Sequence, residues 1–329
     1  MIKHNSPTFP TTYAQAVLES GYLGAGAMCT ELENEWTKIT QSDSAAAVSS
    51  GTSALRLALQ ALEVGSGDEV IIPGYACTSL HSAVLSVGAT PVLADIKPDL
   101  TIDWADISRR FTDKTKAIIV IHLFGAKAEV VNAYVNMKFN SISVIEDFSH
   151  GIFTQRGTLG IASHGPTKLI ASCSGGIVSG NKELIDKVRD LRSYVDKPVS
   201  TKMNDLPNDL SASIALEQLE RLDEIKRIRN IKAANYTKLL LLPPRNNEWN
   251  YRYTIQLENH LAGDISTAMK AKGVFAESPV YDYRLHTDWP RDLPVTDDSF
   301  RSILSLPFHE NITQEEQEQV ISVLGECLK

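Results

Sequence analysis

The chain has 329 residues, 43% of them apolar and 22% charged, so it can bury a sizeable core and is neither disordered nor fibrous. Its 32 basic and 40 acidic residues give a net charge of −8, which disfavours a nucleic-acid-binding surface. No apolar run reaches the roughly 20 residues of a membrane-spanning helix, and the N-terminal MIKHNSPTFP has no apolar signal core. The four cysteines are widely spaced without a CxxC pair, so we expect a cytoplasmic protein without a disulfide framework or a membrane partner.

Short apolar runs alternate with amphipathic helical patterns through the first half of the chain. The apolar runs predict strands, covered on both faces, at residues 69–72, 91–94, 116–121 and 143–146. The helical patterns predict helices at residues 53–62, 78–86, 102–110 and 129–138. This repetition predicts an α/β fold in which helices cover a mostly parallel sheet with right-handed crossovers.

The pattern changes in the second half of the chain. Helices are expected at residues 182–194, 209–240, 262–272 and 314–328, and a strand at residues 251–257. We therefore predict two domains. Residues 1–200 form a large α/β domain with an N-terminal arm, and residues 201–329 form a long connecting helix followed by a small α+β domain.

One acidic residue stands directly after a predicted buried strand. Asp147 follows the run 143–146, and ligands of parallel sheets bind beyond the carboxyl ends of the strands. Such a carboxylate can point into the ligand crevice and hold a protonated ring nitrogen. A simple strand-end cap explains the same residue equally well.

A small, hydroxyl-rich segment opens the first predicted helix of the sheet region. The sequence SSGTSAL covers residues 49–55 and continues into an amphipathic pattern. Unpaired N–H groups at a helix start, together with hydroxyl donors, bind phosphate. An ordinary N-cap by Ser50 or Thr52 is the alternative interpretation.

A lysine follows in a segment of small and hydroxylic residues. Lys168 lies in SHGPTK, ahead of a glycine-rich run that leads into an apolar strand. A desolvated lysine can form a Schiff base, although most lysines are solvated surface charges.

Two other patterns do not support a site. The glycines of residues 21–26 follow no predicted strand and do not read GxGxxG, which argues against a dinucleotide site. The eight histidines show no HxH or HxxxH spacing, so we expect no metal site.

The three features in this order resemble fold-type-I pyridoxal-phosphate enzymes, and in detail the chain resembles the sugar-nucleotide aminotransferase family often called the DegT/StrS family. The resemblance spans nearly the whole chain. Matching segments are SGYLGAG (20–26), ELENEW (31–36), SSGTSALRLAL (49–59), GSGDEVIIPGY (65–75), GATPVLADI (88–96), HLFGAKAE (122–129), VIEDFSHG (144–151), PTK (166–168), LEQLERLDEI (216–225) and LSLPFHENIT (304–313).

The resemblance implies a role for the residues around the cofactor ring. Lys168 stands at the position of the Schiff-base lysine, and Asp147 at that of the aspartate paired with the pyridine nitrogen of pyridoxal 5′-phosphate. His150 stands at a position beside the ring. Cys77 occupies the position at which the family commonly stacks an aromatic side chain, and some relatives share the Tyr-x-Cys pattern of Tyr75 and Cys77.

The resemblance also implies how the phosphate is held. Gly51, Thr52 and Ser163 match phosphate-binding positions, and Ser53 is expected to add a backbone donor. Asn204 matches an asparagine that relatives contribute from the partner subunit. We therefore expect a homodimer with shared active sites.

The chain departs from the family pattern at the substrate side. Leu206 replaces an arginine two residues after the partner-subunit asparagine, which removes a positive charge expected near the phosphate or substrate. The chain is also shorter between Arg192 and Asn204 and in its C-terminal domain, and these regions help to shape the sugar-nucleotide pocket.

The function implied by the resemblance is transfer of an amino group from an amino acid, glutamate for example, to a keto sugar on a nucleotide. The amino-sugar product would serve polysaccharide or secondary-metabolite assembly. Three alternatives stay open. Related sugar dehydratases carry histidine in place of the lysine, so Lys168 argues against that activity. A regulatory protein on the same fold is the second alternative. A nicotinamide-dependent enzyme is the third, and it lacks its glycine fingerprint here.

Overall fold

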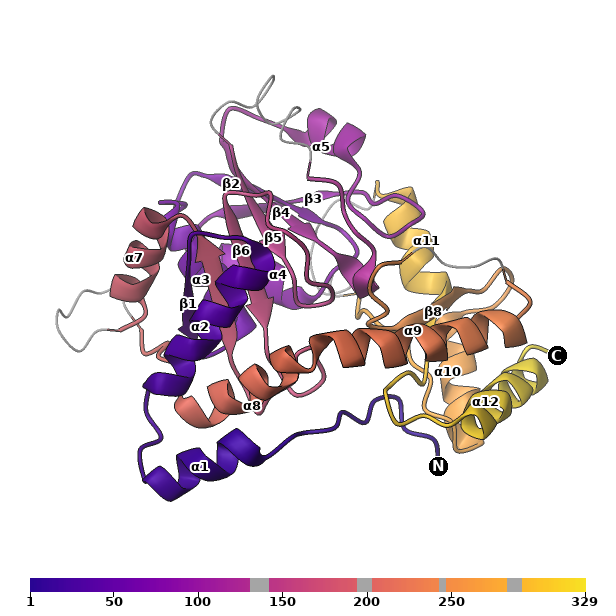
Figure 1. Ribbon diagram of the computed structural model, residues 1–329. Helices are drawn as coiled ribbons and strands as arrows, with labels where there is room; N and C mark the ends of the chain where they lie inside the picture. The colour runs from indigo at the N-terminus through magenta and orange to yellow at the C-terminus, as the bar shows by residue number, and fades with distance from the viewer. Residues whose placement is uncertain (131–141, 194–202, 243–246, 283–291) are drawn as a thin grey trace.

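A computed structural model describes residues 1–130, 142–193, 203–242, 247–282 and 292–329 (Figure 1). Most of the helix expected at residues 129–138 lies outside these ranges.

A seven-stranded sheet organises the first part of the chain. In spatial order it contains β1 (Ser44–Val48), β7 (Gly176–Gly180), β6 (Leu159–Ser163), β5 (Ser143–Asp147), β4 (Thr115–Ile121), β2 (Glu69–Pro73) and β3 (Thr90–Ala94). The pairs from β3 through β6 are parallel, and β7 runs antiparallel to both of its neighbours. The expected mostly parallel sheet is confirmed.

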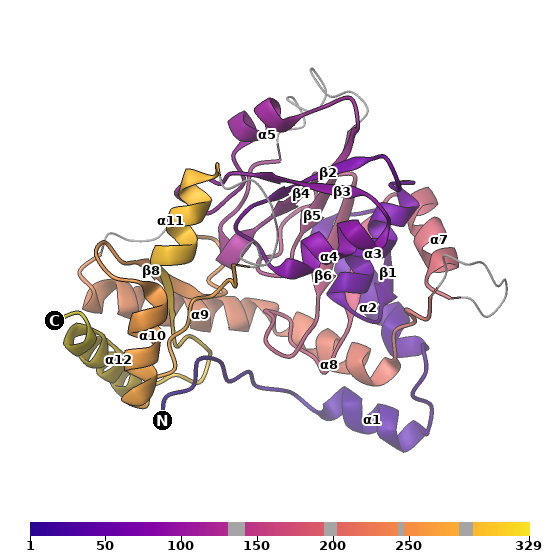
Figure 2. The ribbon, with the colours of Figure 1, turned by 180° about the vertical axis from the view of Figure 1, so that it is seen from behind.

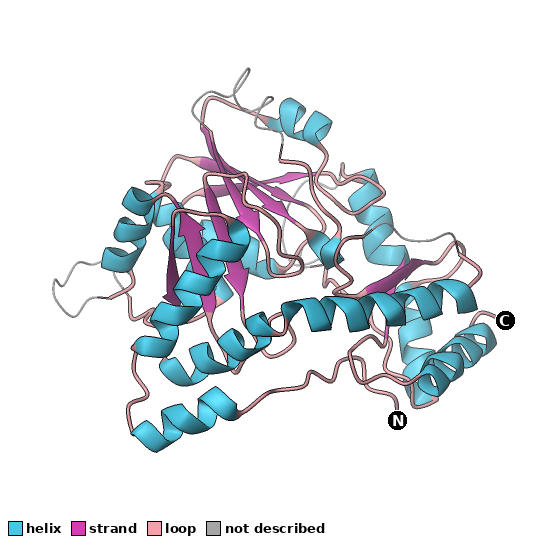
Figure 3. Cartoon of the chain, viewed as in Figure 1, coloured by secondary structure: helices cyan, strands magenta, loops and turns pink. Residues whose placement is uncertain are grey.

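Helices cover both faces of this sheet (Figures 1 and 3). On one face lie α2 (Ala27–Thr40) and α8 (Asp209–Glu220), and on the other α3 (Gly51–Ala61) and α4 (Thr78–Ser86), as the view from behind shows (Figure 2). The other helices described around the sheet are α1 (Thr12–Ser20), α5 (Trp104–Arg110), the 3-10 turn η1 (Leu123–Gly125) and α7 (Lys182–Leu191).

The C-terminal part builds a second, smaller core. The strands β8 (Tyr253–Gln256) and β9 (Ile303–Leu306) pair antiparallel. Around them lie α9 (Leu222–Leu239), α10 (Ala262–Ala271), α11 (Pro294–Ser302) and α12 (Gln314–Cys327). Tyr236, Met269 and Val320 are among the buried residues of this core. The N-terminal Ile2 joins it through hydrogen bonds to the backbone of Gly273 and Phe275.

The long helix expected at residues 209–240 is two helices. The chain leaves helical geometry at Arg221, with φ −92° and ψ 10°, between α8 and α9. The two helices bury different faces, because Ala212 and Leu216 of α8 belong to the core under the sheet whereas Tyr236 of α9 belongs to the smaller core. Arginine is a good helix former, so no residue type in the sequence marks this break.

Candidate active site

A pocket of about 680 Å³, partly open to solvent, lies where β4, β5 and β6 end and where α3 and α4 begin. Seven of the residues predicted for the site line it together: Gly51, Thr52, Cys77, Asp147, His150, Ser163 and Lys168. Ser53 and Asn204 are not among the lining residues. The pocket therefore occupies the edge of the sheet at which ligands of parallel sheets bind.

Asp147 is the last residue of β5 and its side chain is buried. Its Oδ1 accepts a hydrogen bond of 2.8 Å from the Ser149 N–H. No residue in the described ranges donates to Oδ2. A buried carboxylate with one oxygen held by the backbone and the other facing a pocket is suited to bind a cationic N–H group of a ligand.

Lys168 and His150 meet inside the pocket. Lys168 Nζ lies 3.1 Å from His150 Nε2, and the Phe124 N–H donates to His150 Nδ1 over 3.4 Å. Burial lowers the pKa of His150 well below its ordinary value, and the charges of Lys168 and Arg252 lower it further. His150 is therefore a neutral ring beside the lysine amine.

Two aromatic side chains pack against the His150 ring. Tyr251 stacks on it with ring centroids 4.1 Å apart and an interplanar angle of 13°, and Phe124 lies 5.8 Å away at the same angle. The Tyr251 hydroxyl donates to the Thr167 carbonyl over 2.9 Å, and Asn5 Nδ2 donates to the same oxygen over 3.2 Å. No role was predicted for Phe124, Tyr251 and Asn5, because they belong to segments distant from the lysine. Phe124 lies in the matching segment 122–129. Tyr251 and Asn5 lie in no matching segment.

The start of α3 and the end of β6 form a narrow cradle. A Cβ placed on Gly51 would lie 2.5 Å from Ser163 Cβ, so only glycine allows these two segments to approach this closely. Ser50 is the N-cap of α3, and its Oγ accepts a 3.1 Å hydrogen bond from the Ser53 N–H. The Ser53 amide expected to bind a ligand is thus occupied, whereas no partner for the Thr52 N–H or hydroxyl occurs in the part of the chain that the structure describes. An anion at this helix start would find these Thr52 donors.

Cys77 lines the pocket from the N-cap of α4 and is exposed. The ring of Tyr75, two residues before Cys77, does not replace the aromatic side chain that relatives stack at the position of Cys77. Its ring is buried edge-on against Phe300, with centroids 4.9 Å apart, and burial raises its pKa above the ordinary value.

Asn204 is exposed in the segment before α8, and Leu206, two residues further on, is 37% exposed. Between them, Asp205 turns inward and forms a buried ion pair with Arg56 of α3. Within one chain, therefore, Asn204 does not complete the pocket.

The glycines of residues 21–26 have a structural role. They lead into α2, where Asp209 accepts hydrogen bonds from the N–H groups of Gly26, Met28 and Cys29 over 2.8, 3.3 and 3.0 Å. No group of three or more possible metal ligands occurs among the described residues.

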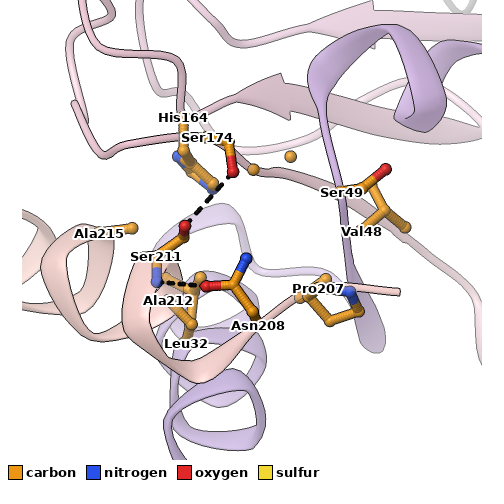
Figure 4. A pocket seen from close by; sticks show the side chains of 13 residues that line it. Leu32, Val48, Ser49, His164, Ser174, Pro207, Asn208, Ser211, Ala212 and Ala215 are labelled. Carbon is orange, nitrogen blue, oxygen red and sulfur yellow. Dashed lines mark hydrogen bonds between the residues drawn. The ribbon is translucent and has the colours of Figure 1, made fainter. Parts of the chain in front are cut away.

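A second hollow lies next to the active site, around His164 (Figure 4). The ring of His164 is buried, both of its nitrogens lack a hydrogen-bond partner among the residues described, and burial lowers its pKa to about 4. Ser174 and Ser211 line the hollow with their hydroxyl oxygens 3.3 Å apart. It contains no residue predicted for the cofactor site.

No described helix combines the length and the apolar character needed to cross a bilayer.

The mostly parallel sheet, with this pocket at its carboxyl edge, has the fold of the fold-type-I pyridoxal-phosphate enzymes. Its sequence matches the model of the DegT/DnrJ/EryC1/StrS aminotransferase family over residues 8–325, and the chain belongs to that family. The enzyme class and the cofactor expected from the sequence, a pyridoxal-phosphate-dependent aminotransferase, are thereby confirmed.

Solved structures share the fold over almost their full length. The aminotransferase TlmJ from Streptoalloteichus hindustanus has a TM-score of 0.91 at 23% identity and covers 100% of this chain and 99% of its own. The putative sugar aminotransferase Spr1654 from Streptococcus pneumoniae, in its PMP form, has a TM-score of 0.87 at 21% identity, with 99% of each chain covered. DesV from S. venezuelae has a TM-score of 0.84 at 24% identity, with 98% of each chain covered.

The residues of the pocket fit the cofactor of this family. A lysine amine, a buried carboxylate with one oxygen facing the pocket, and a glycine–serine cradle at a helix start lie around a single space. A lysine amine can condense with an aldehyde, and a carboxylate can pair with a pyridinium nitrogen. A helix start with free donors can bind a phosphate.

Proposed function

We propose that the protein transfers the amino group of an amino acid, glutamate in the simplest case, to the keto group of a sugar carried on a nucleotide. The meeting of Lys168, Asp147 and the Gly51–Ser163 cradle in one pocket is the observation that carries this proposal. Family membership and similarity to proteins named sugar aminotransferases support a sugar as the acceptor. The nucleotide and the amino donor are parts of the proposal.

Three residues of the pocket have defined tasks in this reaction. The bound cofactor supplies the electron sink that transamination requires. Asp147 holds the proton on its ring nitrogen, and the carboxylate is suited to this because the Ser149 N–H fixes its other oxygen. Lys168 would hold the cofactor, and its Nζ would accept a proton from the substrate and return it. His150 Nε2, at 3.1 Å, keeps Nζ in place.

The phosphate is held by the start of α3 and the end of β6. Gly51 permits the close approach, Thr52 and Ser163 donate hydrogen bonds, and Ser53 stabilises the turn through Ser50. Asn204 of each subunit completes the site of its partner, and the protein is a homodimer with shared active sites.

The test is an assay of purified protein with a panel of keto-sugar nucleotides and glutamate, followed by mass analysis of the products. We expect an amino-sugar nucleotide from at least one member of the panel, together with 2-oxoglutarate. The Lys168→Ala variant is the control and should give no product. Cofactor binding without turnover on any keto sugar or amino donor would contradict the proposal and favour a regulatory protein on this fold.

A further inference from the structure

The segment that carries Asn204 is fastened to the phosphate cradle of its own subunit. The Asp205 carbonyl accepts a 2.9 Å hydrogen bond from the Ser49 N–H, and one carboxylate oxygen lies 3.4 Å from Ser49 Oγ. The other carboxylate oxygen pairs with Arg56 of α3. Both charged side chains are 9% exposed, so the pair is almost fully removed from water.

Hydrogen bonds continue from Ser49 into the first turn of α3. Ser49 Oγ and Ser50 Oγ each lie 3.0 Å from Ser53 Oγ, and Ser50 caps the Ser53 N–H. Arg56 lies four residues, about one helical turn, after Thr52. Figure 4 shows Ser49 on one side of the hollow, with Pro207 and Asn208 on the chain that passes it. A short series of contacts thus joins residues 203–208 to the turn that faces the phosphate.

The burial of this pair has an energetic consequence. Removing one partner of a buried ion pair leaves the other charge buried and unpaired. The stability lost is then far larger than the stability that the intact pair adds relative to apolar side chains. The two charges cancel, so the pair does not attract the phosphate by a net charge. Its effect is to hold α3 and residues 203–208 in a fixed relative position. It therefore acts on the position of the two segments it joins.

We propose that Asp205 and Arg56 are a positioning pair that couples the two cofactor sites of the dimer. This inference rests on the proposed shared site, in which Asn204 reaches the phosphate of the partner subunit. A phosphate bound at the first turn of α3 would fix the position of that turn, and the contacts of Ser49 and Arg56 would in turn fix the position of Asp205. The adjacent Asn204 is then held in the position that the second site needs. The coupling is reciprocal, and cofactor binding is positively cooperative.

The experiment is a titration of the cofactor-free dimer with pyridoxal phosphate, followed by visible absorbance. The unaltered protein should give a Hill coefficient above 1, with a ceiling of about 2 set by its two sites. Asp205→Asn keeps the shape and removes the charge, and we expect about tenfold weaker binding and a Hill coefficient of 1. Arg56→Gln should behave alike, and the double variant should be no worse than either single variant.

Two further variants separate positioning from general stability. Ser49→Ala leaves the ion pair intact but removes the hydroxyl link, and it should also lower the Hill coefficient. Asp106→Asn removes a carboxylate of similar burial that pairs with Arg110 within α5, and cofactor binding should not change. Thermal melting of each cofactor-free variant reports loss of fold independently.

Unchanged cooperativity in folded Asp205→Asn and Ser49→Ala would overturn the inference. So would equal losses in Asp106→Asn, or a monomer that binds the cofactor at full strength. None of these readouts requires a sugar substrate. Failure to find an acceptor sugar, which would overturn the proposed reaction, is therefore a distinguishable result.

Discussion

The carboxylate of Asp147 has one oxygen held by a backbone N–H and one facing the pocket, at the end of a buried parallel strand. In this setting a charge-assisted hydrogen bond is stronger than in water, because few competing dipoles surround it. The role proposed for this residue therefore depends on its charge more than on its shape.

Asp147→Asn should lower turnover by several orders of magnitude while the fold is retained, because the amide no longer keeps the ring nitrogen protonated. Turnover at saturating cofactor and circular dichroism of the variant are the measurements. Near-normal turnover would show that Asp147 does not have this role.

His164 makes a contribution to stability that depends on pH. Its pKa is about 4 in the folded protein and 6.5 ordinarily, because burial disfavours the charged ring. As the pH falls, His164 therefore takes up its proton at a higher pH in the unfolded chain than in the folded protein. The free energy of unfolding should decrease from pH 6.5 to about 4, by an amount on the order of 3 kcal/mol from this residue.

Replacing His164 by leucine should remove that part of the pH dependence. Urea unfolding at pH 7 and pH 4.5 measures it, and the stability lost between these values should be smaller in His164→Leu. An identical loss in both proteins would assign the pH dependence to other groups.

At the scale of elements, the pocket is held together by a contact between the two halves of the chain. Tyr251, just before β8, stacks on His150 after β5 and binds the peptide that precedes Lys168. The second half of the chain therefore helps to set the position of the lysine.

Tyr251→Phe keeps the stacking on His150 and removes the hydrogen bond to Thr167. We expect cofactor affinity to fall by about three- to tenfold, the value of one hydrogen bond, and Tyr251→Ala to lose considerably more. Equilibrium titration with pyridoxal phosphate measures both variants. Equal affinity in the Phe variant and the unaltered protein would show that the hydroxyl does not position the lysine.

Among the strands, those with continuous apolar runs were predictable from sequence, and others were not. The expected strands at residues 69–72 and 116–121 correspond to β2 and β4. The strand β1 was missed because its sequence, SAAAV, is rich in alanine, which has low strand propensity. The strand β6 was missed because LGIAS is short and contains glycine.

The site was predictable where its residues follow one another in motifs. Asp147 and His150 follow the same strand, and Gly51 and Thr52 open the same helix. Tyr251 and the ion pair of Arg56 with Asp205 were not predictable, because each depends on contacts between distant segments. That the Ser53 N–H already donates to Ser50 Oγ was also not predictable, because it depends on the geometry of the helix N-cap.

At the scale of the whole molecule, the division into residues 1–200 and 201–329 stays a prediction, as does the cytoplasmic location. The helix α8 lies beyond residue 200 yet packs its buried face into the core under the sheet. Contacts of this kind tie the second part of the chain closely to the first.

A shared site predicts complementation between inactive subunits. A heterodimer of Lys168→Ala and Asn204→Ala subunits has one site with both changes and one with neither, so activity should return if Asn204→Ala alone is strongly impaired. The measurement is activity after confirmed subunit exchange, with each homodimer as a control. A mixture no more active than its parents would contradict sharing.

The central claim is that Lys168 carries the cofactor in a pyridoxal-phosphate aminotransferase. The most direct measurement is borohydride reduction of the purified protein, followed by peptide mapping by mass spectrometry. We predict a yellow protein in which reduction fixes the cofactor on the peptide that contains Lys168, and no such label in Lys168→Ala. A colourless protein that does not respond to added pyridoxal phosphate, or a label on a different lysine, would contradict the account.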